Sequence, residues 1–383
     1  MPKIPKVILL IETSRAYGRG LLQGIVKYAR LHGPWVFYNE PGGLARPLPK
    51  MKHWDADGII MRWESWKVSV ALKSGAPVII SGHQQKPPKE VPFITTDDVK
   101  IGRMAADYLL DRGFRYFAFC GFDDIYWSRN RCKNFSKRIA ESGFKTHIYK
   151  QPKSRTKRLW ENEQATLADW LKLLPKPVGV MTCNDDRSHY VSEACKTAGL
   201  GIPEQVAILG VDNDELACEL SDSPLSSVAL NVQKGGYEAA ELLDKLMAGE
   251  KPKKQTIVVG PTHIVTRRST DILAIEDHEV AEAVRFIRQH SKEPIQVNDV
   301  VNEIALSRRV LERRFRKVLN RSVLGEIRRT RIEQVAQMLV ETDLPISRIA
   351  SALGYYSVEN IGRYFRREKG MSPLAYRKKY GRK

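Results

Sequence analysis

The sequence lacks the features that mark several classes of protein. Its five cysteines all lie between residues 120 and 218 and include no Cys-x-x-Cys pair, which argues against a disulfide framework and a zinc site and favours a reducing compartment. The N-terminal apolar run, residues 7–11, is too short for a signal peptide. No segment reaches the roughly 20 apolar residues of a membrane span. We therefore expect a cytoplasmic protein that has no membrane partner.

Motifs for catalysis and for nucleotide binding are also absent. Residues 1–270 contain neither a Gly-x-Gly-x-x-Gly fingerprint nor a Gly-x4-Gly-Lys-Ser/Thr phosphate loop. Paired acids follow several short apolar runs, as in TTDD (95–98) and CNDD (183–186). No nucleophile and base accompany them, and their spacing is not that of a metal site. We expect no catalytic residue, no metal and no cofactor, and we interpret these acids as the polar lining of a ligand cleft.

Positive charge is in excess and is unevenly distributed. The chain carries 63 lysines and arginines against 44 acids, a formal net charge of +19. Residues 278–383 hold 23 lysines and arginines against 12 acids, whereas residues 1–277 hold 40 against 32. Such a basic surface is either simply solvated or attracts a polyanion. The charge alone leaves both interpretations open for the C-terminal part.

Residues 1–270 alternate short, uniformly apolar runs with amphipathic stretches. KVILLIE (6–12) is typical of a buried strand, and GLLQGIVKYARLHG (20–33) of the helix that follows it. The same alternation continues to QTIVVGP (255–261). Uniform apolar strands that alternate with helices predict parallel sheets covered on both faces. The number of units predicts two doubly wound α/β subdomains, with ligand chemistry at the C-terminal ends of the strands.

Beyond a break around residues 267–279, only helical periodicity remains. We place the boundary between an α/β effector domain (1–275) and an all-α domain (276–383) there. The segments 297–319 and 346–369 repeat one pattern, a short apolar helix, a turn and a second helix with apolar residues four apart. This is the pattern of a helix-turn-helix, whose second helix enters the DNA major groove. The apolar stripe of the linking segment 322–341 predicts a helix that holds the two modules rigidly apart.

The motifs of this tail carry a family resemblance. IASALGY (349–355), VLERRFRKVLN (310–320) and RYFRREKGMSPLAYR (363–377) resemble the AraC-type DNA-binding domain, which implies a double-stranded DNA operator as partner. The resemblance implies base-edge contacts from Arg309, Glu312 and Arg313 in the first module and from Val358, Glu359 and Arg363 in the second. The other expected DNA contacts, arginines on the same helix faces, are Arg308, Arg316 and Arg366. Because Gly362 faces DNA without a side chain, we expect Arg309 and Arg313 to read more sequence than the second module.

The front of the chain carries a second resemblance. ITTDDVKIGRMAADYLLDRG (94–113), VMTCNDD (180–186), ILGVDND (208–214) and PLSSVALN (224–231) resemble the effector domain shared by lac-repressor-type regulators and type I periplasmic sugar-binding proteins. The resemblance implies ligand contacts from Asp97, Arg131, Asn184 and Asp212. We expect a first loop (Ser14, Arg15, Tyr17, Arg19) to close over the ligand and Arg62 and Trp63 to stack on it or cap it. The alternatives are that Asp97 only caps a helix and that Trp63 and Trp127 are core aromatics. Asp98 and Asp186 are expected to cap helices or face solvent.

The two halves together predict the function. They resemble bacterial regulators of sugar operons, which implies a sequence-specific, DNA-binding transcription regulator, a homodimer that activates genes when a monosaccharide closes the cleft. The ligand implied is xylose or a related pentose. Leu230 stands at a position that is often polar in the family, so either the ligand has fewer hydroxyls or another residue supplies that contact. Two alternatives stay open. The chain either binds or metabolises a sugar without specific DNA readout, or it is a regulator whose front domain only dimerises.

Overall fold

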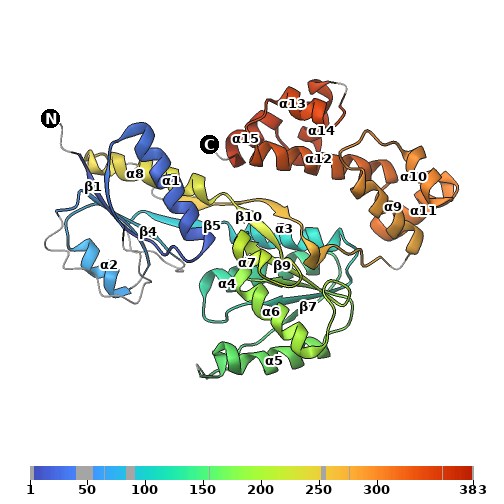
Figure 1. The fold of residues 1–383 in the computed structure, drawn as a ribbon, viewed down its shortest axis with the longest axis horizontal. Helices are drawn as coiled ribbons and strands as arrows, with labels where there is room; N and C mark the ends of the chain where they lie inside the picture. Colours follow the sequence, from blue (N-terminus) through green and yellow to red (C-terminus); the bar gives the residue numbers. More distant parts are fainter. Residues whose placement is uncertain are drawn as a thin grey trace.

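The computed structural model describes residues 4–39, 55–63, 65–82, 91–154, 156–251, 256–275, 277–355 and 357–381. In this part of the chain the strands form two sheets, each covered by helices, and a helical domain follows (Figure 1). The predicted fold class is therefore confirmed. The expected domain boundary falls at residue 276, which lies outside the described residues. No described helix is long and apolar enough to cross a membrane.

The first lobe is built on a sheet whose described pairings are all parallel, in the order β11-β5-β4-β3-β1-β2. Its strands are β1 (Lys6–Leu10), β2 (Val36–Asn39), β3 (Gly58–Arg62), β4 (Val78–Ser81), β5 (Phe93–Thr96) and β11 (Thr256–Val259). Its helices are α1 (Ala16–His32), α2 (Ser65–Leu72) and α8 (Val232–Met247). Val7 and Leu9 face α1 and α8, while Ile8 and Leu10 face the α2 side. Burial on both faces explains why the strand is apolar at every position.

The second lobe repeats this plan, in the order β12-β10-β9-β8-β6-β7. Its strands are β6 (Tyr116–Cys120), β7 (Thr146–Ile148), β8 (Val178–Thr182), β9 (Val206–Asp212), β10 (Ser226–Leu230) and β12 (Pro261–Val265). Its helices are α3 (Asp98–Leu110), α4 (Tyr126–Glu141), α5 (Trp160–Leu173), α6 (Asp185–Ala198) and the short α7 (Glu215–Glu219). α3 and α4 pack on one face of the sheet, and α5 and α6 pack on the other. The sequence did not predict β12, an antiparallel edge strand beside β10.

The described chain passes between the lobes at three places. These crossings lie between β5 and α3, between β10 and α8, and between β11 and β12. Backbone hydrogen bonds join them, from the Asp97 N–H to the Val259 carbonyl (2.9 Å) and from the Asn231 N–H to the Gly260 carbonyl (3.0 Å). We call these joined crossings the hinge, because any rotation of one lobe against the other must occur there.

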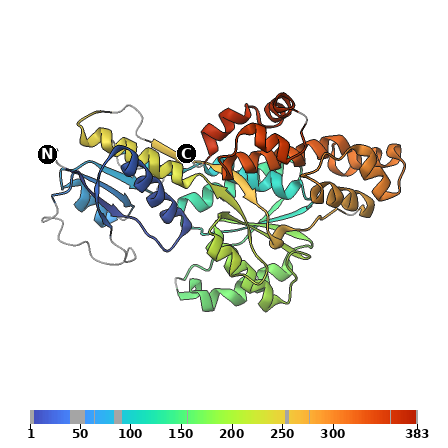
Figure 2. The same ribbon diagram turned by 45° about the horizontal axis from the view of Figure 1, so that its top comes forward.

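The helical domain has two cores that share one long helix. Its helices are α9 (His278–Gln289), α10 (Val297–Ile304), α11 (Arg308–Leu319), α12 (Val323–Glu341), α13 (Ile346–Ala352), α14 (Val358–Lys369) and α15 (Pro373–Tyr380). The first half of α12 packs with α9–α11 and the second half with α13–α15. Figure 2 shows this arrangement, with α12 running through both modules. Asn320 ends α11 in the left-handed conformation (φ 53°), which asparagine adopts at helix ends more readily than most residues other than glycine.

Candidate functional site

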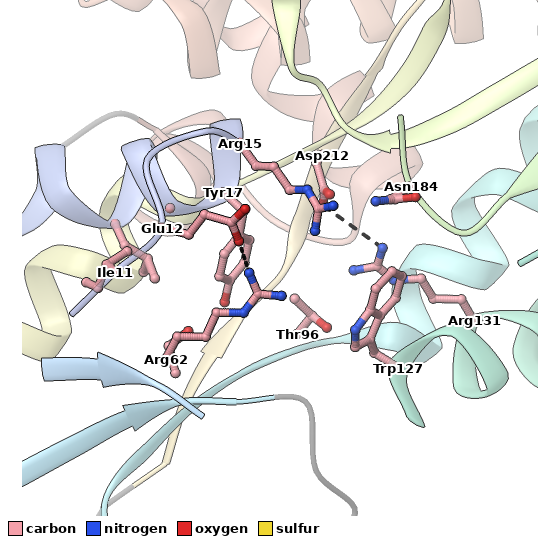
Figure 3. A pocket seen from close by; sticks show the side chains of 13 residues that line it. Ile11, Glu12, Arg15, Tyr17, Arg62, Thr96, Trp127, Arg131, Asn184 and Asp212 are labelled. Carbon is pink, nitrogen blue, oxygen red and sulfur yellow. Dashed lines mark hydrogen bonds and ion pairs between the residues drawn. The ribbon is translucent and has the colours of Figure 1, made fainter. Parts of the chain in front are cut away.

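A pocket lies between the two lobes, where the C-terminal ends of strands from both sheets meet (Figure 3). β3, β4, β5 and β9 end at or beside residues that line it. The carboxyl ends of parallel strands are the usual place for ligands in such sheets. The lining residues of the first lobe are Ile11, Glu12, Arg15, Tyr17, Gly18, Leu21, Arg62, Ser81 and Thr96, and those of the second lobe are Trp127, Arg131, Asn184 and Asp212.

Arg131 organises the wall of the pocket in the second lobe. It is 2 % exposed, and its guanidinium donates to Asp98 Oδ1 (3.1 Å) and to the Cys183 carbonyl (2.6 Å). The same group lies 4.0 Å from an Asp212 carboxylate oxygen and 4.6 Å from the centre of the Trp127 ring. Burial raises the pKa of Asp212 to about 6, against the opposing charge of Arg131. Asp212 therefore offers hydrogen-bond acceptors that change protonation state in mildly acidic solution.

The wall of the first lobe holds a second ion pair. Arg62, at the end of β3, contacts the carboxylate of Glu12. Burial raises the pKa of Tyr17 to about 12, so its hydroxyl stays neutral and both donates and accepts. Donors, acceptors and an aromatic face around one pocket suit a polyol, whose hydroxyls need both kinds of partner. The described residues include no cluster of His, Cys, Asp and Glu able to hold a metal ion.

The start of α1 is bonded to the second lobe beside the pocket. Arg15 lies 2.7 Å from Asp186 Oδ2, and Arg19 reaches both carboxylate oxygens of Asp214 at 2.8 and 2.9 Å. The Ala16 N–H donates to Asp214 Oδ2 (2.7 Å). We call these contacts the cleft latch. They hold the lobes together beside the pocket, which Arg15 also lines.

The second helices of both helix-turn-helix modules present a basic face. Leu311 and Phe315 in α11 are buried, as are Ile361 and Phe365 in α14. Exposed arginines without a described hydrogen-bond or ion-pair partner cover the outer sides, namely Arg308, Arg309, Arg313, Arg316 and Arg366. Val358 and Glu359 are exposed as well. This face carries positive charge that the described parts of the chain do not neutralise, as phosphate binding requires.

Some side chains on these helices have partners within the chain. Arg363 donates to Asn360 Oδ1 (3.3 Å). Glu312 is half-buried and accepts the Val323 N–H at 3.4 Å, so its carboxylate faces the start of α12. Gly362 has no atoms within 4 Å of where a Cβ would lie, so this part of the face is open. The first module therefore presents more free guanidinium groups than the second.

The helical domain contacts the second lobe near the start of α12. Arg321 and Arg329 both bond to Asp111, just after α3, at 2.7 and 2.8 Å. The same two arginines flank the fully buried Glu326. Although burial raises the pKa of Glu326, Arg329 and Arg321 hold it below its ordinary value.

A second contact of the helical domain lies at the hinge and involves the end of α12 and α15. On the second lobe, the Tyr376 hydroxyl donates to the Thr262 carbonyl (3.1 Å) and His263 Nε2 lies 3.1 Å from Glu341 Oε1. On the first-lobe side, Asn231 Nδ2 donates to the Lys379 carbonyl (3.2 Å), and Lys234 Nζ donates to the carbonyls of Lys378 (3.2 Å) and Lys379 (3.0 Å). We call this set of contacts the hinge dock. It joins α12 and α15 to both lobes at once.

Comparison with known proteins gives two domain matches. Residues 106–270 match the periplasmic binding protein-like domain, and residues 300–379 match a helix-turn-helix domain. The xylose operon regulatory protein of Escherichia coli (strain K12) is 30% identical over 380 residues, which cover 97% of this chain and 96% of the relative. The chain belongs to the family of xylose operon regulatory proteins.

Other members of this family support the assignment. The xylose operon regulatory protein of Haemophilus influenzae (strain ATCC 51907 / DSM 11121 / KW20 / Rd) is 29% identical over 380 residues, which cover 97% of this chain and 98% of the relative. A solved structure of the xylose-binding transcription activator xylR has a TM-score of 0.62 and 28% identity, with 99% of each chain covered. This chain is therefore a sugar-responsive, DNA-binding transcription regulator, and the prediction of that function is confirmed.

Within this family fold, most residues that the sequence analysis put at the ligand do lie together. Arg15, Tyr17, Arg62, Arg131, Asn184 and Asp212 all line the pocket. Arg19 belongs instead to the cleft latch, and Ser14 donates its hydroxyl to Glu12 (2.5 Å) outside the lining. Trp63 packs beside Gly82 with the core on the α2 side, which agrees with its interpretation as a core aromatic.

Asp97 needs a correction. Its carboxylate accepts the Lys100 N–H (3.1 Å) and the Lys100 ammonium (2.5 Å), so it caps α3 and does not line the pocket. Asp98, one residue on, is 6 % exposed and bonds to Arg131 and to the Thr96 hydroxyl (2.7 Å). Asp98 therefore does not face solvent as expected, and it does not line the pocket either. The two neighbours have different partners because successive residues at the start of a helix point about 100° apart, and neither of them lines the pocket.

The sequence analysis missed several residues of the site. Glu12, Ser81 and Thr96 line the pocket, and Trp127 lines it beside Arg131. A usable signal exists for the first three, because each stands at or just beyond the end of a predicted strand. Leu230 is not in the lining and instead packs between the cores of the two lobes. Asp186 belongs to the cleft latch through its contact with Arg15, whereas the sequence analysis expected it to cap a helix or face solvent.

Proposed function

We propose that this regulator binds xylose or a related pentose in the pocket between the lobes and that the ligand stabilises the arrangement held by the cleft latch. The relatives named as xylose operon regulatory proteins and the solved structure named as a xylose-binding activator support this ligand. The alternation of carboxylates and guanidiniums around the pocket supports a sugar in general.

The lining residues of the two lobes would bind different groups of the ligand. Asp212 and Asn184 would bond to hydroxyls from the second lobe, and Arg62 with Glu12 would bond to hydroxyls from the first. The Trp127 ring would pack against a C–H face of the sugar ring, as aromatic rings do in polar ligand sites. Because both lobes contribute, the ligand binds the closed cleft better than the open one and shifts the population towards it.

One observation carries the link from sugar to DNA, namely the hinge dock. Lys234 and Asn231 belong to the start of α8 on the first lobe, whereas Thr262 and His263 belong to β12 on the second. A rotation of the lobes about the hinge changes the separation of these two sets, so α15 cannot keep both contacts unchanged. Closure of the cleft would thereby alter how the DNA-binding domain is held.

The remaining parts of the proposal follow from this regulatory role. The protein would act as a homodimer whose tails bind two DNA sites and would activate transcription of pentose genes in the cytoplasm, where the DNA is. The exposed Leu216 and Leu220, around α7, offer an apolar surface for the dimer. The effector domain would end near residue 275 and would bind the sugar without converting it.

The experiment combines a sugar panel with DNA binding. The full chain is titrated calorimetrically with xylose, arabinose, ribose, lyxose and glucose, and a DNA fragment selected from a random library reports DNA affinity by fluorescence anisotropy. The proposal expects binding of a pentose, tighter than glucose, and a change in DNA affinity when that pentose is present. Absence of binding by every sugar, or sugar binding that leaves DNA affinity unaltered, contradicts it. Recovery of the starting sugar in full after long incubation is expected for a non-enzyme.

A further inference from the structure

The end of β9 and the loop after it supply groups to three different parts of the protein. Asp212 lines the pocket, the Asn213 side-chain oxygen accepts from Arg267 (3.0 Å), and Asp214 accepts from α1 in the cleft latch. Asp212 and Asn213 have φ angles of 105° and 51°. These values lie in the left-handed region, which residues other than glycine avoid. Because the conformation is unfavourable by itself, neighbouring groups must hold it.

Asp185, the first residue of α6, makes the bonds that hold this loop. It is 2 % exposed, and its Oδ2 accepts the Asp214 N–H at 2.8 Å. Its Oδ1 accepts the Ser227 hydroxyl at 2.6 Å, and the Ser227 oxygen in turn accepts the Asn213 N–H at 3.0 Å. One carboxyl group thus fixes two successive backbone amides, one directly and one through a serine.

The neighbouring strand β9 leaves space for the carboxyl group of Asp185. A Cβ at Gly210 would lie 2.2 Å from Asp185 Oδ1, so only glycine leaves room for the side chain against β9. Burial raises the pKa of Asp185 well above its ordinary value, and the neighbouring charge of Asp212 adds to this. A buried carboxyl beside two others is costly for the fold. Packing alone gives no reason for an acid here, whereas the bonds to the loop do.

We propose that Asp185, acting with Ser227, is the positioning residue that holds the pocket carboxylate of Asp212 and the latch carboxylate of Asp214 in their working places together. The inference rests on the proposed function, because it assigns a role at the same site. Asp185 does not line the pocket and acts only through the loop. It links the capture of the ligand to the closing of the cleft, because the two amides that it holds lie between the residues that carry these carboxylates.

The test uses the full chain and three variants. Ser227→Ala removes the bridging hydroxyl with little change of volume, Asp185→Ala removes both bonds, and Asp185→Asn keeps an oxygen for the Asp214 N–H. Ser226→Ala is the matched control. That buried serine precedes Ser227 on β10 but bonds to the backbone of Arg267 and to Thr270. Stopped-flow tryptophan fluorescence measures the rates at which xylose associates and dissociates, and calorimetry gives the binding stoichiometry.

The inference predicts a change in the dissociation rate. Losing these buried bonds loosens the latched state, so Ser227→Ala and Asp185→Ala should release xylose about tenfold faster or more. The association rate should stay within about twofold and the stoichiometry near one site per chain, with Asp185→Asn recovering part of the loss. A purely structural role would instead lower the stoichiometry and leave the dissociation rate of the folded fraction unchanged. That result, or Ser227→Ala behaving as Ser226→Ala does, overturns the inference.

A second measurement needs no sugar. Amide hydrogen exchange of Asn213 should be faster in Ser227→Ala than in Ser226→Ala, because that amide donates to the Ser227 hydroxyl. Exchange of Asp214 should be faster in Asp185→Ala, because that amide donates directly to Asp185. Equal exchange of Asn213 in the two serine variants refutes the positioning role. A wild-type chain that binds no pentose would contradict the proposed function, and the exchange rates would still decide the role of Asp185.

Discussion

Removing the first-lobe half of the hinge dock should weaken the coupling between sugar and DNA. The Lys378 and Lys379 carbonyls belong to the last turn of α15, whose carbonyls have no partner within the helix. The Lys234 ammonium and the Asn231 amide bond to them, and a cation at a helix C-terminus is also favoured by the helix dipole. In the double variant Asn231→Ala/Lys234→Met, these carbonyls lose both partners while the second-lobe contacts remain.

The size of the effect follows from the exposure of these bonds. A partly exposed hydrogen bond contributes about 0.5–1 kcal/mol, so the two side chains together stabilise the docked arrangement by about 1–2 kcal/mol. That range corresponds to a roughly 5- to 30-fold change in the balance between docked and released states. The ratio of the DNA affinities with and without xylose should therefore move towards one, by up to about 5- to 30-fold. The reason is that the free energy of coupling between sugar and DNA cannot exceed the free-energy difference between the docked and released states.

The assay is DNA anisotropy with and without saturating xylose, with calorimetry for the sugar alone. Sugar affinity in the absence of DNA should stay within about threefold of the wild type, because neither side chain lines the pocket. Gln233→Ala is the control, since Gln233 lies on the same helix but bonds to Gln23 of α1 (2.6 Å). If the double variant keeps the wild-type ratio of DNA affinities, the hinge dock does not transmit closure.

Three further predictions concern the pocket, the core and the DNA face. Because the pKa of Asp212 is raised to about 6, its carboxylate becomes protonated as the pH falls through that value. Xylose affinity measured by calorimetry should therefore weaken from pH 7 to pH 5. The variant Asp212→Asn should bind xylose weakly at both pH values. Glu163 and Arg187 form an ion pair at most 1 % exposed, so Glu163→Leu alone should lower the free energy of unfolding by about 3–5 kcal/mol, whereas Glu163→Leu/Arg187→Met should recover most of it in denaturant titrations. An unchanged single variant would contradict this. Arg309→Ala should weaken binding to a selected DNA site by about 1–3 kcal/mol and binding to random DNA less, and equal losses would make Arg309 a phosphate contact.

The fold was predictable because its burial pattern is local. β1 is apolar at successive positions because Val7 and Ile8 face different helical layers. Such a short run of consecutive apolar residues can be recognised in the sequence and is typical of a parallel strand buried on both faces. The repeated pair of helices in the tail was visible for the same reason, through Leu311 and Phe315 four residues apart. β12 was missed because it exists through its antiparallel pairing with β10, a contact that no short window contains.

The pocket was predictable only in part. Arg131 and Asp212 follow motifs at strand ends and helix starts, so their place could be inferred. Asp97 and Asp98 are chemically identical neighbours, and only the phase of α3 decides that Asp98 meets Arg131 while Asp97 caps the helix. Glu12 stands at the end of a predicted strand, but its pairing with Arg62 from another strand could not be predicted from local sequence.

Local sequence therefore determines which segments become strands and helices, that two helix-turn-helix modules end the chain, and that positive charge gathers there, because each of these depends on residues within a few turns of one another. The tertiary structure decides which acids face the ligand, that Asp214 latches the cleft to α1, and that α15 rests on both lobes at the hinge. These contacts join residues far apart in the chain, and their geometry depends on how two sheets and a helical domain pack. The coupling of sugar to DNA belongs to this second group.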